Sequence, residues 1–362
     1  MSILLAIAIL ALLVLVHESG HFLAARLQGI HVSQFSLGFG PALWSYVGEK
    51  TEYAIRLFPL GGYVGFPDDD PESSIPPNDP NLLKNRGIGD RAIVISAGVF
   101  ANFVFAYLVL LLMVLTVGIG VVDQPGVMVA KVLDANSPAA IAGLQVGDLI
   151  LRANQVTISN DLNNLEQFQA LISQNGKKAI NLGIERGSQN LEVMITPTGE
   201  AGSSKIGVGL NWNGKAHRQP IRNLPKAMAK AAQNFERVVV MTWAGLGQLV
   251  TNFQATATKV SGPVAIVATG AQLVKSDQAG LFDFTAIVSI NLAIINLLPL
   301  PALDGGQLFF LLIELLRGGK PLPSKFQENV MQGGLVMILG LGLFMIARDS
   351  LNLIHQSGSL PL

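Results

Sequence analysis

The chain has 362 residues, of which 50% are hydrophobic and 13% are charged, and its mean hydropathy is +0.47. Because soluble domains carry about 25% charged residues, this composition indicates a membrane protein. The net charge of zero gives no sign of nucleic-acid binding, and the lack of cysteine excludes thiolate zinc ligands, disulfides and cysteine nucleophiles.

Four apolar stretches are long enough to cross the ~30 Å hydrocarbon core of a bilayer. They predict transmembrane helices over residues 1–26, 92–122, 282–303 and 329–348. The first stretch lacks the basic start and the small-residue cleavage site of a signal peptide, so we expect it to remain as a span. Burial in a soluble core is the alternative for the last two stretches, but their length without charge favours spanning.

Lysine and arginine side chains near the span ends predict the direction of each span. They gather in segments 27–91 and 304–328, which we therefore assign to the cytoplasm. The N-terminus, the tail 349–362 and the long segment between the second and third spans are assigned to the outside. The first and third spans then both run inward, so the inner end of the first span and Asp304 reach the same membrane depth.

The inner end of the first span carries His17-Glu18-Ser19-Gly20-His21, a pattern typical of catalytic zinc sites. On a helix, His17 and His21 lie one turn apart on one face, so both imidazoles can reach one Zn²⁺. Glu18 would then act as general base toward a water molecule that the metal acidifies. A pattern with three fixed positions also occurs by chance, but ionisable residues inside a span indicate function.

A two-histidine site requires a further protein ligand, with one position left open for water. Asp304 offers a carboxylate at the predicted depth, and Gly305-Gly306 after it would let the backbone come close to a metal. The alternative is that Asp304 caps the N-terminus of the helix that follows. Because Asp304 and the histidines share a depth, we favour the metal ligand.

The segment between the first two spans contains a predicted β-hairpin. Residues 51–57 show the two-residue period of a strand, and Gly61-Gly62 is expected to turn the chain into Tyr63 and a second strand. An edge of this hairpin would pair with an extended substrate, and Gly61, Gly62 and Tyr63 would contact it. A small cytoplasmic hairpin without substrate contact is the alternative.

Residues 123–199 have the pattern of a compact α+β domain outside the membrane. Strands are predicted over 127–132, 146–150, 179–186 and 191–196, and helices over 137–144 and 165–174. Segment 200–281 is a linker region. Its amphipathic helix over 225–250 is expected either to lie on the outer membrane face or to pack as an ordinary soluble helix.

Motifs along nearly the whole chain occur in one order. They are His17–His21, Phe35–Pro41, Pro59–Val64, Ser96-Ala97-Gly98 with Asn102, Ser261-Gly262-Pro263, and Asn296–Gly306. Together they resemble the site-2 protease family of intramembrane zinc metalloproteases, in its bacterial form with a single PDZ domain. The fold that follows is a polytopic α-helical membrane protein with four transmembrane helices, a membrane-associated β-hairpin and an inserted α+β PDZ-like domain.

The resemblance implies roles for individual residues. His17, His21 and Asp304 would bind zinc, with Glu18 as general base. Asn102 and Asn296 would help to hold the substrate backbone or the oxyanion, although amides within spans also serve as contacts between helices.

For the PDZ domain, Gly126 and Val127 belong to the candidate loop that would bind a peptide carboxylate. The domain would either recognise trimmed substrate ends or exclude substrates with bulky outer domains, and the absence of a basic residue from the loop favours exclusion.

The expected function is that of a zinc metalloendopeptidase that cuts transmembrane segments of single-spanning membrane proteins. Such cleavage is typical of regulated intramembrane proteolysis, with anti-sigma factors or signal-peptide remnants as substrates. Expected partners are these substrates, the lipid bilayer and peptide C-termini, but no nucleic acid. The expected location is the bacterial inner membrane, with a thylakoid or organellar membrane as the alternative. A non-catalytic PDZ adaptor with a structural zinc is the alternative function, against which the intact Glu18 argues.

Overall fold

A computed structural model describes residues 2–70, 73–254, 260, 262–276 and 278–358. The chain forms two compact units, which we call the helical unit (Met1–Met113 with Pro225–Leu362) and the PDZ-like unit (Val114–Leu224). Ser261 of the predicted Ser261-Gly262-Pro263 motif lies outside the described residues.

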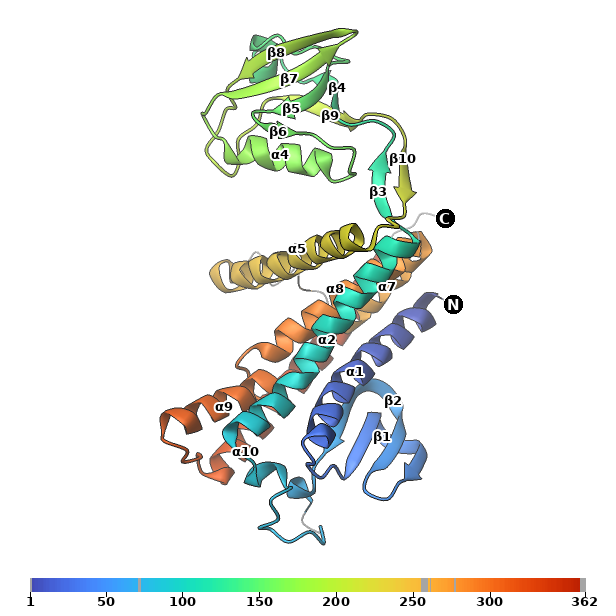
Figure 1. Ribbon diagram of the computed structural model, residues 1–362, viewed down its shortest axis with the longest axis vertical. Coiled ribbons are helices and arrows are strands. Elements are labelled where there is room, and N and C mark those ends of the chain that lie inside the picture. The colour runs from blue at the N-terminus through green and yellow to red at the C-terminus, as the bar shows by residue number, and fades with distance from the viewer. Residues whose placement is uncertain (1, 71–72, 255–259, 261, 277, 359–362) are drawn as a thin grey trace. The chain divides into compact units, whose positions relative to one another are not determined.

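Four helices of the helical unit are long and apolar enough to cross a membrane, within the part of the chain that the structure describes. They are α1 (Ser2–Leu27), α2 (Ile88–Thr116), α8 (Gln278–Leu297) and α10 (Ser324–Gly358) (Figure 1). The prediction of a polytopic helical protein is confirmed. The second helix ends six residues before the predicted end of its span, because Gly118 has a positive φ of 90° and residues 119–122 form a strand.

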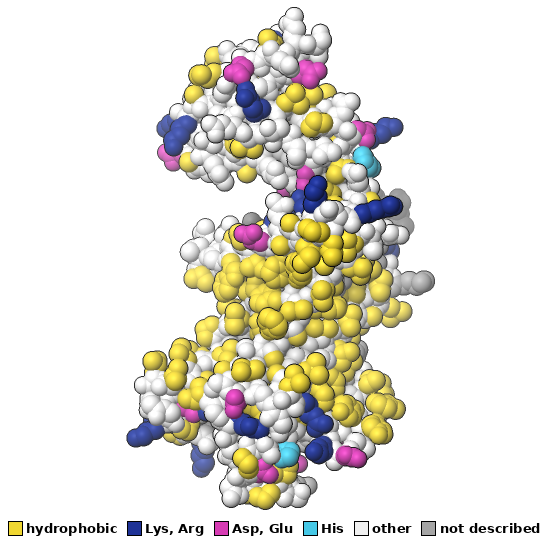
Figure 2. Space-filling model, in the orientation of Figure 1, with side chains coloured by type: hydrophobic (Ala, Val, Ile, Leu, Met, Phe, Trp, Pro, Cys, Tyr) yellow, Lys and Arg dark blue, Asp and Glu magenta, His cyan; other side chains and the backbone are white. Residues whose placement is uncertain are grey.

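Among the described residues, the unit also contains α5 (Leu224–Thr251), α7 (Pro263–Ser276) and α9 (Asp304–Leu316). α5 is the helix that the amphipathic pattern predicts. α7 packs against α1 and α8 around the buried side chains of Ile9, Leu13 and Phe284. Figure 2 shows hydrophobic side chains across the middle of the helical unit, whereas charged side chains gather at its lower end in that view.

The segment between α1 and α2 is built on a β-hairpin of two long strands, β1 (Gln34–Val47) and β2 (Glu52–Gly65). Its turn lies at residues 48–51, where the Gly48 N–H donates to the Thr51 carbonyl at 3.0 Å. The second half of β1 pairs antiparallel with residues 52–56. Residues 34–37 of β1 pair with both halves of β2, in parallel with residues 52–55 and antiparallel with residues 62–65. Two short 3-10 turns, Pro67–Asp69 and Leu83–Asn85, follow.

Gly61 and Gly62 lie within β2, which reverses its direction between residues 55 and 62, because residues 52–55 run parallel and residues 62–65 antiparallel to residues 34–37 of β1. The predicted reversal is thus present, but its two arms do not pair with each other, since residues 34–37 lie between them. The two glycines also allow close packing. Gly61 has a positive φ of 104°, and a Cβ there would lie 2.1 Å from the ring of Phe39. A Cβ on Gly62 would lie 2.8 Å from the Ser36 carbonyl oxygen and 3.0 Å from Glu18 Cγ. The glycines thus let β2 pass between β1 and the helix that carries Glu18.

The PDZ-like unit has its own apolar core beneath a six-stranded sheet, as the α+β pattern predicts. The sheet has the order β8 (Gln189–Ile195), β7 (Ile180–Arg186), β5 (Leu149–Ala153), β4 (Val127–Val132) and β9 (Val208–Trp212), with β6 (Val156–Thr157) paired to β5. Helices α3 (Pro138–Ile141) and α4 (Asn164–Gln174) accompany it, and β3 (Ile119–Val122) pairs with β10 (Ala216–Gln219) in a separate ribbon.

β9 lies beyond residue 199, where the sequence pattern ended the domain, and its pairing with β4 changes the expectation for Gly126 and Val127. Val127 pairs with Ile150 on one side and with Trp212 on the other, and its side chain is fully buried. The Gly126 carbonyl accepts a hydrogen bond from Asn164. Among the described residues, β4 is thus paired on both sides at Val127, which leaves no open edge there for a peptide strand.

Candidate metal centre

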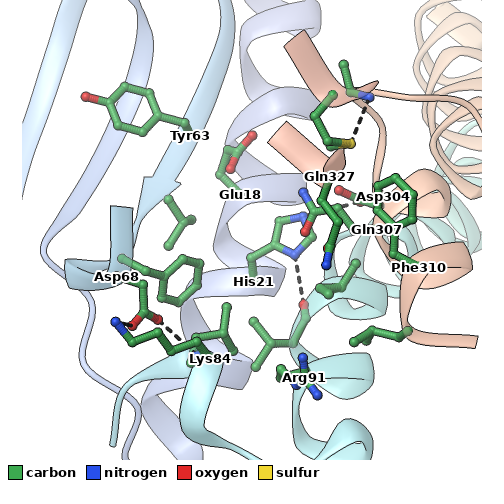
Figure 3. A pocket seen from close by; sticks show the side chains of 18 of the residues that line it. Glu18, His21, Tyr63, Asp68, Lys84, Arg91, Asp304, Gln307, Phe310 and Gln327 are labelled. Carbon is green, nitrogen blue, oxygen red and sulfur yellow. Dashed lines mark hydrogen bonds and ion pairs between the residues drawn. The ribbon is translucent and has the colours of Figure 1, made fainter. Parts of the chain in front are cut away.

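His17, His21 and Asp304 come together although two distant helices supply them. α1 presents the two histidines one turn apart, with their Nε2 atoms separated by 3.2 Å. The Asp304 Oδ2 atom lies 3.3 Å from His17 Nε2 and 3.4 Å from His21 Nε2. Asp304 is the first residue of α9, and Leu303 occupies the N-cap position, so the capping alternative is not observed. Figure 3 shows His21 and Asp304 directed into one cavity.

The spacing of the three atoms suits a zinc ion. Ligands at 2.0–2.1 Å from a tetrahedral zinc lie about 3.3 Å from one another, which matches the observed separations. Within the described residues, Asp304 Oδ2 is buried and has no partner besides the two imidazole nitrogens, an arrangement that a shared cation would satisfy. Two imidazoles and one carboxylate also leave room for a water ligand, as catalytic zinc requires.

The loop between α8 and α9 positions Asp304. Pro299 and Pro301 follow the end of α8, where proline prevents the helix from continuing. A Cβ on Gly305 would lie 2.2 Å from the Leu298 carbonyl oxygen, and one on Gly306 would lie 2.3 Å from that of Leu300. The two glycines therefore allow α9 to start directly against this loop, rather than bringing backbone close to a metal.

Glu18 lies beside the three-atom cluster. It is half-buried and lines a cavity of ≈ 600 Å³ together with His17, His21 and Asp304. Figure 3 shows its side chain between β2 and the start of α9. Because Gly62 has no side chain, β2 approaches Glu18 closely and forms the opposite wall of the cavity.

Asn102 and Asn296 both reach His17, but at opposite nitrogens of its ring. Asn296 Nδ2 lies 3.2 Å from His17 Nε2, on the side of the cluster. Asn102 Nδ2 lies 3.2 Å from His17 Nδ1, on the far side, and the residue is completely buried. Asn102 also receives a hydrogen bond on its backbone oxygen from Ser289 of α8. Both predicted asparagines thus adjoin the cluster, in different surroundings.

α2 supports the histidines through features that the sequence analysis did not identify. His21 Nδ1 lies 2.8 Å from the Val94 carbonyl oxygen. Gly98 lies one turn further along α2, and a Cβ there would be 2.3 Å from His21 Nε2. A backbone carbonyl carries no side-chain signal, but the four-residue spacing of Gly98 and Asn102 could have indicated one helix face.

The three predicted substrate-binding residues of the hairpin lie in different surroundings. Gly62 borders the cavity and faces Glu18, whereas Gly61 packs against Phe39 within the hairpin. Tyr63 also borders the cavity, but its hydroxyl donates to Gln34 and accepts from Arg56, and its ring points away from Glu18 (Figure 3).

A family model described as Peptidase family M50 matches residues 5–341. The chain belongs to peptidase family M50. A relative of this M50 chain in Nostoc sp. strain PCC 7120, named "Putative zinc metalloprotease all3971", is 57% identical over 98% of each chain. The "Membrane metalloprotease ARASP, chloroplastic" of Arabidopsis thaliana is 45% identical over 97% of this chain and 79% of its own length.

The M50 chain is therefore a multi-pass membrane zinc metalloprotease of the site-2 type, and the adaptor alternative is set aside. Among solved structures, it is similar to the PDZ domain of the SdrC-like protein of Listeria monocytogenes. That match has 25% sequence identity and a TM-score of 0.21, and it covers 25% of this chain and 90% of the other.

Proposed function

We propose that this M50 peptidase cuts transmembrane segments of single-spanning membrane proteins near the cytoplasmic face and releases a cytoplasmic fragment, as in regulated intramembrane proteolysis. One observation carries the proposal. His17, Glu18 and His21 lie within α1, a candidate membrane span, and face a cavity that Asp304 completes. A peptide bond that reaches this cavity must itself lie at the level of the membrane.

The proposed chemistry is divided among four side chains and a metal. His17, His21 and Asp304 would hold Zn²⁺, which when bound supplies Lewis acidity toward water and the scissile carbonyl. Glu18 takes the proton of the attacking water and later gives it to the leaving amine nitrogen. Asn296 presents its amide on the cluster side of His17, where a donor stabilises negative charge on the carbonyl oxygen.

The proposed contact with substrate is an edge of β2. Within the described residues, segment 62–65 pairs with residues 34–37 of β1 on one side only, and Gly62 brings this segment against Glu18. A helix must unwind before its peptide bonds can be attacked, and its backbone groups then need new partners. Addition of the unwound segment to this edge would supply those partners and present the scissile bond to Glu18.

The proposed orientation places the hairpin and α9 in the cytoplasm, and the chain ends and PDZ-like unit outside. The distribution of lysine and arginine between the spans supports this orientation. We propose the bacterial inner membrane as the location, which cell fractionation would distinguish from a thylakoid membrane. Exclusion of substrates with bulky outer domains is the proposed role of the PDZ-like unit, and the burial of Val127 supports it.

Replacement of Glu18 by Gln tests the assignment of the general base. The amide cannot accept the proton, so cleavage of a single-spanning substrate in proteoliposomes should fall by about 10²- to 10⁴-fold. Zinc content, measured by elemental analysis, should stay at the wild-type level because Glu18 is not a ligand. Ser19→Ala is the matched control and should cleave normally. Equal turnover by Glu18→Gln and wild type would reject the proposed role.

A further inference from the structure

We infer that Asn102 is a positioning residue for His17. The Asn102 side chain accepts a hydrogen bond from His17 Nδ1–H and so directs His17 Nε2 toward the metal. The inference rests on the proposed function. It gives Asn102 a role different from the contact with substrate or oxyanion that the family resemblance implied.

The two nitrogens of His17 have different neighbours. Nε2 faces the cluster, 3.2 Å from His21 Nε2 and 3.3 Å from Asp304 Oδ2. A neutral imidazole that offers the Nε2 lone pair to a metal carries its proton on Nδ1. The group that meets Nδ1 must therefore be an acceptor, and Asn102 is the residue at that position.

The Asn102 amide can supply that acceptor. Its nitrogen and oxygen exchange places when the amide turns by 180°, and only the surrounding hydrogen bonds decide between the two orientations. With the nitrogen at His17 Nδ1, the Asn102 oxygen is buried and has no hydrogen-bond partner. Turning the amide therefore breaks no hydrogen bond of the oxygen and brings an acceptor to 3.2 Å from Nδ1–H.

His21 is held in the corresponding way by the same helix. Its Nδ1 lies 2.8 Å from the Val94 carbonyl oxygen, which can only accept, so its Nε2 is also left for the metal. Val94, Gly98 and Asn102 follow one another at four-residue intervals on α2, and the missing side chain at Gly98 leaves space for both imidazoles. Ligating histidines commonly donate their second N–H to such an acceptor, which fixes the tautomer and the ring.

Burial separates the role of Asn102 from that of Asn296. Asn102 has 0% exposure and does not line the cavity, so a substrate cannot touch its side chain. Asn296 is half-buried and adjoins the metal-facing nitrogen. The structure thus assigns Asn102 to the orientation of a ligand and leaves Asn296 for the reacting carbonyl.

The test measures zinc affinity in the purified full-length chain, by competition with a chromophoric chelator. Asn102→Leu keeps the size of the side chain but removes the acceptor, so the zinc Kd should rise about 10- to 100-fold. Asn102→Asp restores an acceptor and should bind zinc within about threefold of wild type, or more tightly. Ser289→Ala removes the neighbouring hydrogen bond to the Asn102 backbone and is the matched control, with an unchanged Kd.

Other results would overturn the inference. Wild-type zinc affinity in Asn102→Leu, with cleavage lost, would assign Asn102 to the substrate instead. An equal loss of zinc affinity in Asn102→Leu and Asn102→Asp would show that Asn102 only fills space. If Asn102→Leu does not fold, a loss of zinc affinity in Asn102→Asp is by itself enough to reject the inference. A wild-type chain that binds no zinc would refute the proposed function itself. Wild-type zinc binding with no effect of Asn102→Leu would refute only the inference about Asn102.

Discussion

At Gly98, α2 lies directly against the imidazoles of His17 and His21. A Cβ there would lie 2.3 Å from His21 Nε2 and 2.8 Å from His17 Cε1, closer than real Cβ atoms approach other heavy atoms. On the face of α1 that meets α2, a Cβ on Gly20 would lie 2.4 Å from the Ala97 carbonyl oxygen. Two glycines therefore set the distance between α1 and α2, and with it the position of both imidazoles.

Replacement of Gly98 by Ala should displace the imidazoles and raise the zinc Kd by at least about tenfold, the effect expected when support of a ligand is lost. Gly89→Ala is the matched control on the same helix, because no atom lies within 4 Å of a Cβ there. Both changes replace glycine by a better helix former, with a gain of up to about 1 kcal/mol at Gly98 in the helix interior, so propensity cannot explain a loss of zinc affinity. Chelator competition provides the measurement, and equal zinc affinity in both variants would contradict the steric argument.

At the scale of elements, an ion pair joins the start of α2 to the end of α9. The Arg91 guanidinium binds both oxygens of Glu314, with 18% and 9% of the side chains exposed, respectively. α2 supports the histidines and α9 carries Asp304, so this pair links the two parts of the metal centre. It lies in the wall of the same cavity.

Loss of one partner should destabilise the helical unit. Glu314→Leu leaves the Arg91 charge largely buried without compensation, and we expect the free energy of unfolding to fall by about 3–5 kcal/mol. The double variant Arg91→Leu/Glu314→Leu should lose clearly less. Denaturant titration in detergent gives the four values of a double-mutant cycle. Additive losses from the two leucine changes would show that the pair is not coupled.

At the scale of the whole molecule, the chain consists of two units with separate cores, and the PDZ-like unit contains its own ion pair between the buried Asp148 and the half-buried Arg186. Arg186 donates to both carboxylate oxygens of Asp148 at 2.7 Å, and the Gln145 N–H donates at 2.8 Å. Burial raises the pKa of Asp148, but the hydrogen bonds from Arg186 and Gln145 outweigh it, and the pKa lies below its ordinary value. The ionised form therefore stabilises this unit.

The sign of this pKa shift predicts an acid-sensitive unit. A carboxyl whose pKa is lower in the folded state stabilises fully above its unfolded pKa of about 3.9, and this contribution is lost as the pH falls through the folded value. We expect hydrogen-exchange protection of residues 127–195 to fall below about pH 4 in the intact chain. Asp148→Asn should be less protected at pH 7 and less sensitive to acid, whereas Glu166→Gln, at an exposed carboxylate, should match wild type. An unchanged acid response in Asp148→Asn would refute the assignment.

The sequence by itself predicted the four spans, most strands and helices of the PDZ-like unit up to residue 196, and the three side chains that the structure brings together. Length without charge identifies a span, and the helical period places His17 and His21 on one face. The distribution of basic residues predicts the direction of each span, and this alone predicts that Asp304 shares the depth of His17 and His21. Each of these signals is local or additive along the chain, which is why it can be read without the fold.

Three features were decided only by the tertiary structure. They are the course of β2 at Gly61 and Gly62, the pairing of Val127 with β9, and the contact of Asn102 with Nδ1 of His17. Each depends on which distant segment lies alongside, and pairing between distant segments leaves no periodic trace in either one. The Val94 carbonyl belongs to the same class, since every residue has one and only packing selects which carbonyl a histidine meets.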